Sequence, residues 1–236
     1  MNARVPHHEH ITLSDTTAGP FVLNASQAIG AIAVQIPGAT AVFRRLKLDF
    51  CCGGQVSLRE AAESKNLNVQ AVLEELASLH RPASLSGLQE PVALIDHVLE
   101  RYHAVHREQL PELVRMARRV EAVHREHPQV PAGLAAHLET MEQELLEHMW
   151  KEENILFPML KAGGNPFVDQ PISKMRAEHV HHGVALERLA ELSNNGNPPQ
   201  GACNTWRALF AGITQLNDDL INHIHLENNV LFAQFT

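Results

Sequence analysis

The chain has 236 residues, of which 44% are hydrophobic and 19% charged, the proportions of a folded globular protein, so disorder throughout is excluded. Three cysteines are too few for a disulfide scaffold. The net charge of −8, without a long basic stretch, argues against nucleic acid as a partner. The apolar run at 28–34 is too short for a membrane span and lacks a basic flank, so we expect a cytoplasmic protein with no membrane partner.

The N-terminal third is predicted to be a tail and a small helical domain. Residues 1–22 have no apolar periodicity and include a His-rich tract at 7–10; we expect a flexible tail, although such tracts can bind metal. Residues 23–80 have helical spacing, with a capping box from Ser57 to Glu60 that opens one helix. Asn68 is a candidate cap for the next helix. A proline-containing linker is expected at 81–91.

From residue 92 to the end, the chain consists of long helical patterns separated by short breakers. The four patterns are each more than 20 residues long and cover 92–126, 132–162, 172–193 and 202–235. Pro111 is expected to kink the first of them. Long helices joined by short loops predict an up-down bundle, so the fold class is all-α: a four-helix bundle preceded by a small helical domain.

The histidines of this region follow an internal repeat. Residues 148–157 align with 223–232 with five identical positions in ten, and His103 and His179 lie at nearly the same distance upstream of the two segments. Each half of the bundle is therefore predicted to hold one helix with a single histidine and one with a His-x-x-x-Glu pair. The six residues selected in this way are His103, His148, Glu152, His179, His223 and Glu227.

This pattern favours a two-metal centre over buried histidines of the ordinary kind. Residues i and i+4 share one helix face, so each His and Glu pair can reach the same point inside the bundle. A single buried histidine is usually a hydrogen-bonded core residue. Six ionisable groups converging on a core, however, are costly without a metal. Imidazole and carboxylate without thiolate favour iron and then manganese, with the glutamates as bridges and a further oxygen between the metals.

A rival pattern is rejected. Glu100-x-x-His103 and Glu121-x-x-His124 match the Glu-x-x-His of ferritin-like sites, but both lie on one predicted helix, whereas such sites need one motif on each of two helices. His124 remains a candidate outer-shell residue or a residue at the end of the bundle. Four further histidines break the repeat and are interpreted as solvated or outer-shell residues: His106, His181, His182 and His225.

The chain resembles the Repair of Iron Centres family, the YtfE/ScdA type of di-iron protein. The segments that carry the resemblance are Ile95-Asp96-His97, His148 to Pro158, Asp218 to Phe232 and the turn Asp49 to Gly54. The resemblance implies a hemerythrin-like domain with a non-haem centre of two irons, in which the four histidines are terminal ligands and Glu152 and Glu227 are bridges. It also implies that Glu144 and Glu178 lie near the centre and line an access route.

The resemblance further implies that the protein restores iron–sulfur clusters damaged by nitric oxide or peroxide, with damaged iron–sulfur proteins as partners. Three functions remain open: iron supply to a damaged cluster, enzymatic reduction of nitric oxide, and binding of nitric oxide or oxygen without turnover. An accessory thiol domain favours repair, and the absence of a flavin or dinucleotide motif argues against a self-sufficient reductase. The oligomeric state is left open, with a homodimer as one candidate.

Two interpretations of Cys51 and Cys52 also remain open. The residues are adjacent in sequence, so a permanent disulfide would be a strained small ring. They are either small apolar residues in a turn, or exposed thiolates whose pKa is lowered by the backbone N–H groups of the turn and which act in delivery or redox chemistry. Cys203 is interpreted as structural.

Overall fold

The computed structural model describes residues 10–13, 21–36, 38–79 and 90–235. The chain divides into two compact units, one of Met1–Gly87 with Asn228–Val230 and the other of Leu88–Glu227 with Leu231–Thr236. Histidines 7 and 8 of the His-rich tract and the predicted linker up to residue 89 lie outside the described residues.

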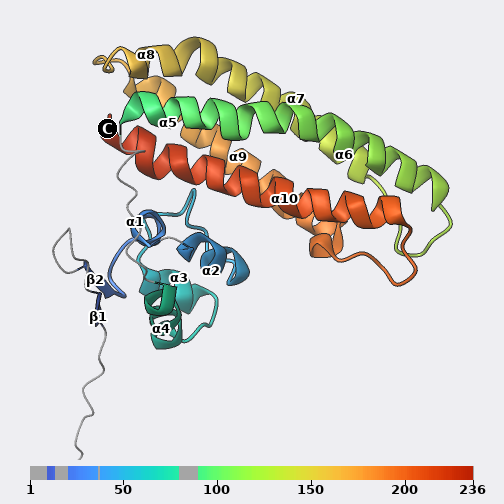
Figure 1. The fold of residues 1–236 in the computed structure, drawn as a ribbon, viewed down its shortest axis with the longest axis horizontal. Coiled ribbons are helices and arrows are strands. Elements are labelled where there is room, and N and C mark those ends of the chain that lie inside the picture. The colour runs from blue at the N-terminus through green and yellow to red at the C-terminus, as the bar shows by residue number, and fades with distance from the viewer. Residues whose placement is uncertain (1–9, 14–20, 37, 80–89, 236) are drawn as a thin grey trace, which may run out of the picture. The chain divides into compact units, whose positions relative to one another are not determined.

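The larger unit is a bundle of four long helical segments, which appear in Figure 1 from green to red. Its elements are α5 (Pro91–Val98), η1 (Leu99–His103), α6 (Ala104–Val123), α7 (Leu134–Lys151), η2 (Glu152–Leu156), α8 (Phe157–Lys161), α9 (Asp169–Leu192), η3 (Asn194–Gly196), α10 (Asn204–Leu226), η4 (Glu227–Leu231) and η5 (Phe232–Gln234). Helix α6 packs against α7 and α10, and α9 packs against the same two helices, which closes a ring of four. The predicted all-α bundle is confirmed.

The bundle is held together by apolar side chains that recur at helical spacing. Leu110, Leu113 and Ala117 of α6 are buried, as are Leu209 and Leu216 of α10. Burial of such side chains stabilises by roughly 25 cal/mol for each Å² removed from water. The apolar stripes therefore direct the same face of each helix inward, and any polar side chain on that face is carried into the core.

Three of the helical segments contain a π-helical turn where the sequence predicts uninterrupted α-helix. Segment η1 ends at His103, η2 begins at Glu152 and η4 begins at Glu227. All three residues belong to the predicted metal centre. Single π turns inside α-helices are frequent at functional sites. Helix α6 itself continues through Pro111, and the departure from α-helical geometry in this segment lies earlier, at η1.

The described residues of the smaller unit form four short helices, α1 (Ile29–Gln35), α2 (Ala39–Arg45), α3 (Leu58–Ser64) and α4 (Val69–Leu79). The capping box of α3 is confirmed, because the Ser57 side chain accepts from the Glu60 N–H and the Glu60 carboxylate accepts from the Ser57 N–H. Asn68 caps α4 through the N–H of Ala71, also as predicted. The helices enclose a core of large apolar side chains that includes Ile29, Ile32, Ile36, Phe43, Phe50, Leu58, Leu73 and Leu76.

Two strands precede these helices, where the sequence analysis expects a loose tail. Strands β1 (His10–Leu13) and β2 (Phe21–Asn24) pair antiparallel, with His10 opposite Asn24 and Leu13 opposite Phe21. The prediction for 1–22 is wrong for these residues. Strand β1 does alternate polar and apolar residues, but over only four positions, the lower limit of a strand signal, and β2 does not alternate.

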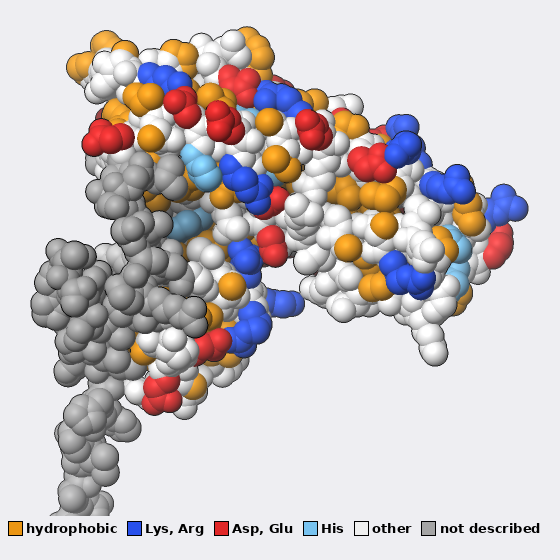
Figure 2. All heavy atoms as spheres, in the orientation of Figure 1, with side chains coloured by type: hydrophobic (Ala, Val, Ile, Leu, Met, Phe, Trp, Pro, Cys, Tyr) orange, Lys and Arg blue, Asp and Glu red, His pale blue; other side chains and the backbone are white. Residues whose placement is uncertain are grey.

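The surface of the described part of the chain is chemically mixed. Figure 2 shows acidic and basic side chains interspersed along the visible face of the bundle. Among the described residues, every helix is too short or too polar to cross a membrane.

Candidate metal centre

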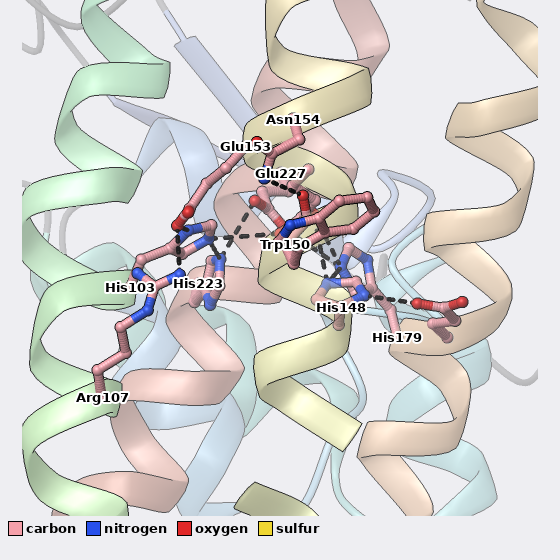
Figure 3. A network of polar contacts seen from close by, with 11 residues as sticks. His103, Arg107, His148, Trp150, Glu153, Asn154, His179, His223 and Glu227 are labelled. Carbon is pink, nitrogen blue, oxygen red and sulfur yellow. Dashed lines mark hydrogen bonds and ion pairs between the residues drawn. The ribbon is translucent and has the colours of Figure 1, made fainter. Parts of the chain in front are cut away.

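The structure brings the six residues of the repeat together inside the bundle. His103, His223, Glu152 and Glu227 form one group of potential ligands, which we name the first cluster. His148, His179 and the same two glutamates form the other, the second cluster. All six side chains are at most 1% exposed. Figure 3 shows the histidine pairs on either side of the shared carboxylate region.

Each shared carboxylate directs one oxygen to each cluster. Glu152 Oε2 lies 3.3 Å from His103 Nε2, and its Oε1 lies 3.3 Å from His148 Nε2. Glu227 Oε1 lies 3.1 Å from His223 Nε2, and its Oε2 lies 3.1 Å from His179 Nε2. Each carboxylate therefore lies in contact with histidines of both clusters.

The nitrogen and oxygen atoms of the two clusters lie close together without satisfying one another's hydrogen-bonding capacity. The two histidines of each cluster face each other through Nε2 atoms, at 3.2 Å in the first cluster and 3.1 Å in the second. Both oxygens of Glu152 and Oε2 of Glu227 are buried without a hydrogen-bond partner among the described residues. Buried polar atoms without partners are rare because they cost free energy. The donor set therefore fits cations placed between the side chains.

The electrostatics keep both glutamates ionised. Burial favours the neutral acid, but the positive charges of His148 and His103, whose Nε2 atoms contact the carboxylate, outweigh burial and hold the pKa of Glu152 well below its ordinary value. Burial and the charge of Glu152 act to raise the pKa of Glu227. His223 and His179 lower it by more, so the pKa of Glu227 is below its ordinary value. Both side chains are therefore available as anionic oxygen ligands.

One histidine of each cluster is held from behind by a carboxylate. His103 Nδ1 lies 2.7 Å from Glu153 Oε1, which also accepts from Arg107 at 2.8 Å. A carboxylate on Nδ1 fixes the tautomer and the ring orientation, so that Nε2 faces the centre. Neither Glu153 nor Arg107 belongs to the repeat that identifies the six residues, although Glu153 directly follows Glu152.

The corresponding support in the second cluster is Glu178. Its Oε2 lies 2.9 Å from His148 Nδ1, and its Oε1 accepts from Lys151 at 2.9 Å and lies 3.2 Å from Lys174 Nζ. Burial acts to raise the pKa of Glu178, but these three cations lower it to about 2. Glu178 was predicted near the centre, and the structure places it against a ligand candidate.

The other two outer-shell candidates contact residues that are not proposed ligands. Glu144 is partly exposed, and its Oε1 lies 3.3 Å from His181 Nε2, which is itself exposed. His124 follows α6, 21 residues after His103, a separation of roughly 30 Å along a helix. Its Nε2 lies 3.2 Å from Cys203 Sγ. Of the two places considered for His124, the structure therefore gives the end of the bundle.

Two further buried histidines border the centre. His106 lies 5.5 Å from the His223 ring, and His182 lies 4.9 Å from the His148 ring, both measured between ring centroids. Burial and the neighbouring histidines lower the pKa of His106 to about 2 and that of His182 to about 3. Both rings are therefore neutral at physiological pH, and both are buried rather than solvated. His225 is also buried, whereas His181 is exposed.

The cysteine turn does not have the geometry that a lowered thiol pKa requires. Asp49 Oδ1 accepts from the N–H groups of Cys51 and Cys52, and Oδ2 accepts from that of Gly53. The N–H groups expected to stabilise a thiolate are therefore occupied by a carboxylate. The hydrogen bond with Cys52, burial and the charge of Asp49 raise the pKa of the Cys51 thiol. For Cys51 this direction is opposite to the one that the thiolate interpretation requires, and neither cysteine is in a disulfide.

Comparisons with known proteins match both parts of the chain. The family model described as "Hemerythrin HHE cation binding domain" matches residues 94–235. The ScdA_N model, described as a domain of unknown function (DUF542), matches residues 25–80. The chain is 50% identical over 212 residues to the iron-sulfur cluster repair protein YtfE of Yersinia pseudotuberculosis serotype IB (strain PB1/+), covering 89% of this chain and 96% of that protein. The protein of the same name from Yersinia pestis (strain Pestoides F) is 49% identical over the same coverage.

Proposed function

This chain belongs to the family of the YtfE iron–sulfur cluster repair proteins, and on that premise we propose that it restores iron–sulfur clusters damaged by nitric oxide or peroxide by supplying iron from a centre of two ions. The supporting observation is the pair of buried clusters that share Glu152 and Glu227. Two sets of two histidines joined by two carboxylates provide a place for two ions, with no side chain left as an uncompensated charge.

The donor chemistry supports iron as the metal. Each cluster offers two imidazole nitrogens and two carboxylate oxygens and contains no thiolate, a set that suits iron and manganese. Four protein donors leave positions open on an ion that takes six ligands. Bound iron supplies redox and ligand-exchange chemistry, and the same irons are the cargo of the repair reaction.

The residues of the chain have distinct roles in this proposal. Each pair of histidines would hold one ion, and Glu152 and Glu227 would supply oxygen ligands to both. Glu153 and Glu178 orient His103 and His148 through their Nδ1 atoms. Cys51 and Cys52 add soft donors, which we assign to the delivery of iron to a damaged cluster, because sulfur is the donor with which iron–sulfur proteins hold their clusters.

A second candidate function rests on the open positions. An ion with four protein donors can bind nitric oxide or oxygen as a further ligand, and the buried clusters shield such a ligand from water. The protein would then bind or reduce nitric oxide, with electrons supplied by another protein.

One experiment separates the two functions. The iron-loaded protein is mixed with an iron–sulfur enzyme inactivated by nitric oxide, and recovered activity, iron transfer and nitrous oxide are measured together. Iron supply predicts recovery that follows iron transfer without nitrous oxide. Nitrous oxide production without iron transfer would contradict it.

Two variants control this experiment. Glu227→Leu removes a shared carboxylate and should abolish recovery. Glu187→Leu makes the same chemical change at an exposed position of α9 and should leave recovery unchanged.

A further inference from the structure

Three donor atoms outside the bundle centre come together at the turn between α2 and α3. They belong to Asp49, Cys51 and Cys52, and they all lie within 4.8 Å of one another. We propose that this turn is a second kind of metal site, which binds one divalent ion of the Zn²⁺ and Fe²⁺ class through two thiolates and one carboxylate. The donor set differs from the nitrogen and oxygen set of the bundle, so the site is chemically distinct.

The distances between the donors match those of a tetrahedral ion. The two Sγ atoms lie 3.8 Å apart. Two metal–sulfur bonds of about 2.3 Å at the tetrahedral angle place their sulfurs about 3.8 Å apart. Asp49 Oδ1 lies 3.2 Å from Cys51 Sγ, close to the roughly 3.5 Å expected between a sulfur and an oxygen on the same ion. An ion therefore needs only a small adjustment of the side chains.

The turn holds the carboxylate beside the sulfurs before any ion arrives. Three backbone N–H groups, of Cys51, Cys52 and Gly53, donate to Asp49. A Cβ at Gly53 would lie 3.0 Å from both the carbonyl oxygen and Oδ2 of Asp49, so a side chain at this position would push the carboxylate away. The glycine is therefore explained by the close approach of the turn to Asp49.

The charge at the turn favours a cation. Binding of a divalent ion forms two metal–sulfur bonds and releases the two thiol protons to solvent, with no change in oxidation state. The two thiolates and the carboxylate then carry three negative charges, which the ion offsets in part. The same negative neighbours disfavour a bare thiolate at Cys51, because nothing then compensates its charge.

Three protein donors leave a fourth tetrahedral position open, as in zinc sites that exchange ligands. A thiolate of a partner protein can occupy this position, so the ion can pass to other sulfur ligands. Transfer of the ion to a partner protein rests on the proposed function. The existence of the metal site does not depend on that function.

The test uses cobalt as a spectroscopic probe of the full-length, reduced, iron-loaded protein. Co²⁺ bound by thiolates gives an intense sulfur-to-metal charge-transfer band, which the nitrogen and oxygen donors of the bundle cannot produce. We expect one equivalent of Co²⁺ to produce this band. The double variant Cys51→Ser/Cys52→Ser should lose it, and Cys203→Ser should keep it. A missing band in the wild type, or a band that depends on Cys203, would overturn the proposal.

The carboxylate ligand is tested separately. Asp49→Asn keeps an oxygen acceptor for the N–H groups of the cysteines but removes the charge, and should weaken Co²⁺ binding about 10-fold or more. Unchanged affinity would refute the three-donor site.

X-ray absorption of wild-type protein with one added equivalent of Zn²⁺ tests the site without a variant. Two sulfur ligands together with nitrogen or oxygen ligands are expected, and a ligand shell without sulfur contradicts the site. A thiolate band in a protein that fails to restore damaged enzymes would disprove the proposed function and leave the site standing.

Discussion

The two clusters of the bundle share Glu152 and Glu227 but differ in the carboxylate that contacts the Nδ1 atom of one histidine in each cluster. In the first cluster, His103 is held by Glu153, whose side chain is 26% exposed and is paired with Arg107. In the second, His148 is held by Glu178, which is 17% exposed and lies within reach of two lysines. The first cluster also contains a buried nitrogen, His223 Nδ1, without a hydrogen-bond partner among the described residues.

The comparison separates the residues that the repeat preserves, which are the proposed metal ligands, from the outer carboxylates, which it does not preserve. Under the proposed function, the inner residues recur in both halves because each of the two ions would need the same donors. The outer supports come from different helices and have different partners. Since outer carboxylates tune metal affinity, we expect the second cluster to hold its ion more tightly and the first to release its ion more readily.

The largest effect is expected where the clusters do not differ, at the shared carboxylates. Glu227→Leu removes one oxygen donor from each cluster and leaves Glu152 without its partner bridge. Both ions should be lost together, with a decrease in affinity beyond the ~10–100-fold caused by loss of an outer-shell partner. Metal analysis of the purified variant measures this. A fully loaded protein with an unchanged iron spectrum would rule out the bridging role, and Glu187→Leu is the matched control.

Removal of the outer carboxylates tests the difference itself. Glu178→Gln and Glu153→Gln each replace a charged acceptor by a neutral one of the same size. We expect Glu178→Gln to weaken one ion by about 10–100-fold, and Glu153→Gln to have a smaller effect because its carboxylate is more exposed. Competition with a chelator gives the two affinities. Equal losses would mean that the clusters are equivalent.

The pH dependence of the metal-free protein is a further test. The lowered pKa of Glu178, about 2 against an ordinary 4.5, contributes stability that is present above pH 4.5 and is lost as the pH falls toward 2. Burial acts to lower the pKa of His148, but Glu152, Glu227 and Glu178 raise it to about 9; this contribution is complete below pH 6.5 and disappears as the pH rises through 9.

The stability difference between the wild type and Glu178→Gln should therefore be largest between pH 4.5 and 6.5 and shrink on both sides. Chemical denaturation of both metal-free proteins across this range measures it. A difference that grows steadily above pH 9 would have the wrong sign for a Glu178–His148 pair.

The smallest effect is expected at the rim of the second cluster. Lys174 Nζ lies 3.2 Å from Glu178, but the lysine side chain is 64% exposed. Ion pairs with an exposed partner contribute about 0–1 kcal/mol. Lys174→Ala should change the free energy of unfolding by no more than that and leave metal content unchanged. A loss of iron as large as that of Glu178→Gln would show that the charge of Lys174, and not only the carboxylate, holds the cluster.

The sequence pattern could predict the inner donors, whereas of their supports only Glu178 was named, through the family resemblance. The six residues repeat at fixed spacing, and helical periodicity alone puts them on inward faces, where the structure brings them together; their ligand roles stay a prediction. Glu153 and Arg107 have no such signal, because they meet through the packing of helical segments far apart in the sequence. The π turns at His103, Glu152 and Glu227 were also missed, since they depend on tertiary packing rather than on local propensity.

In the smaller unit, too, the features that depend on local sequence were predicted and those that depend on tertiary structure were not. The capping residues Ser57 and Asn68 act on their own helices, so the sequence reveals them. The two strands of four residues are at the lower limit of the pattern that identifies a strand in a sequence. The role of Asp49 depends on a turn that folds back on itself, and for this reason the backbone donors assigned to the thiols turned out to belong to a carboxylate.

The central claim is that the two clusters hold two irons joined by shared carboxylates, and Mössbauer spectroscopy with metal analysis tests it most directly. Protein made in iron-sufficient cells should contain close to two irons per chain, and their spectrum should show magnetic coupling between the two ions. A single tightly held zinc, or iron that behaves as an isolated ion, would contradict the account.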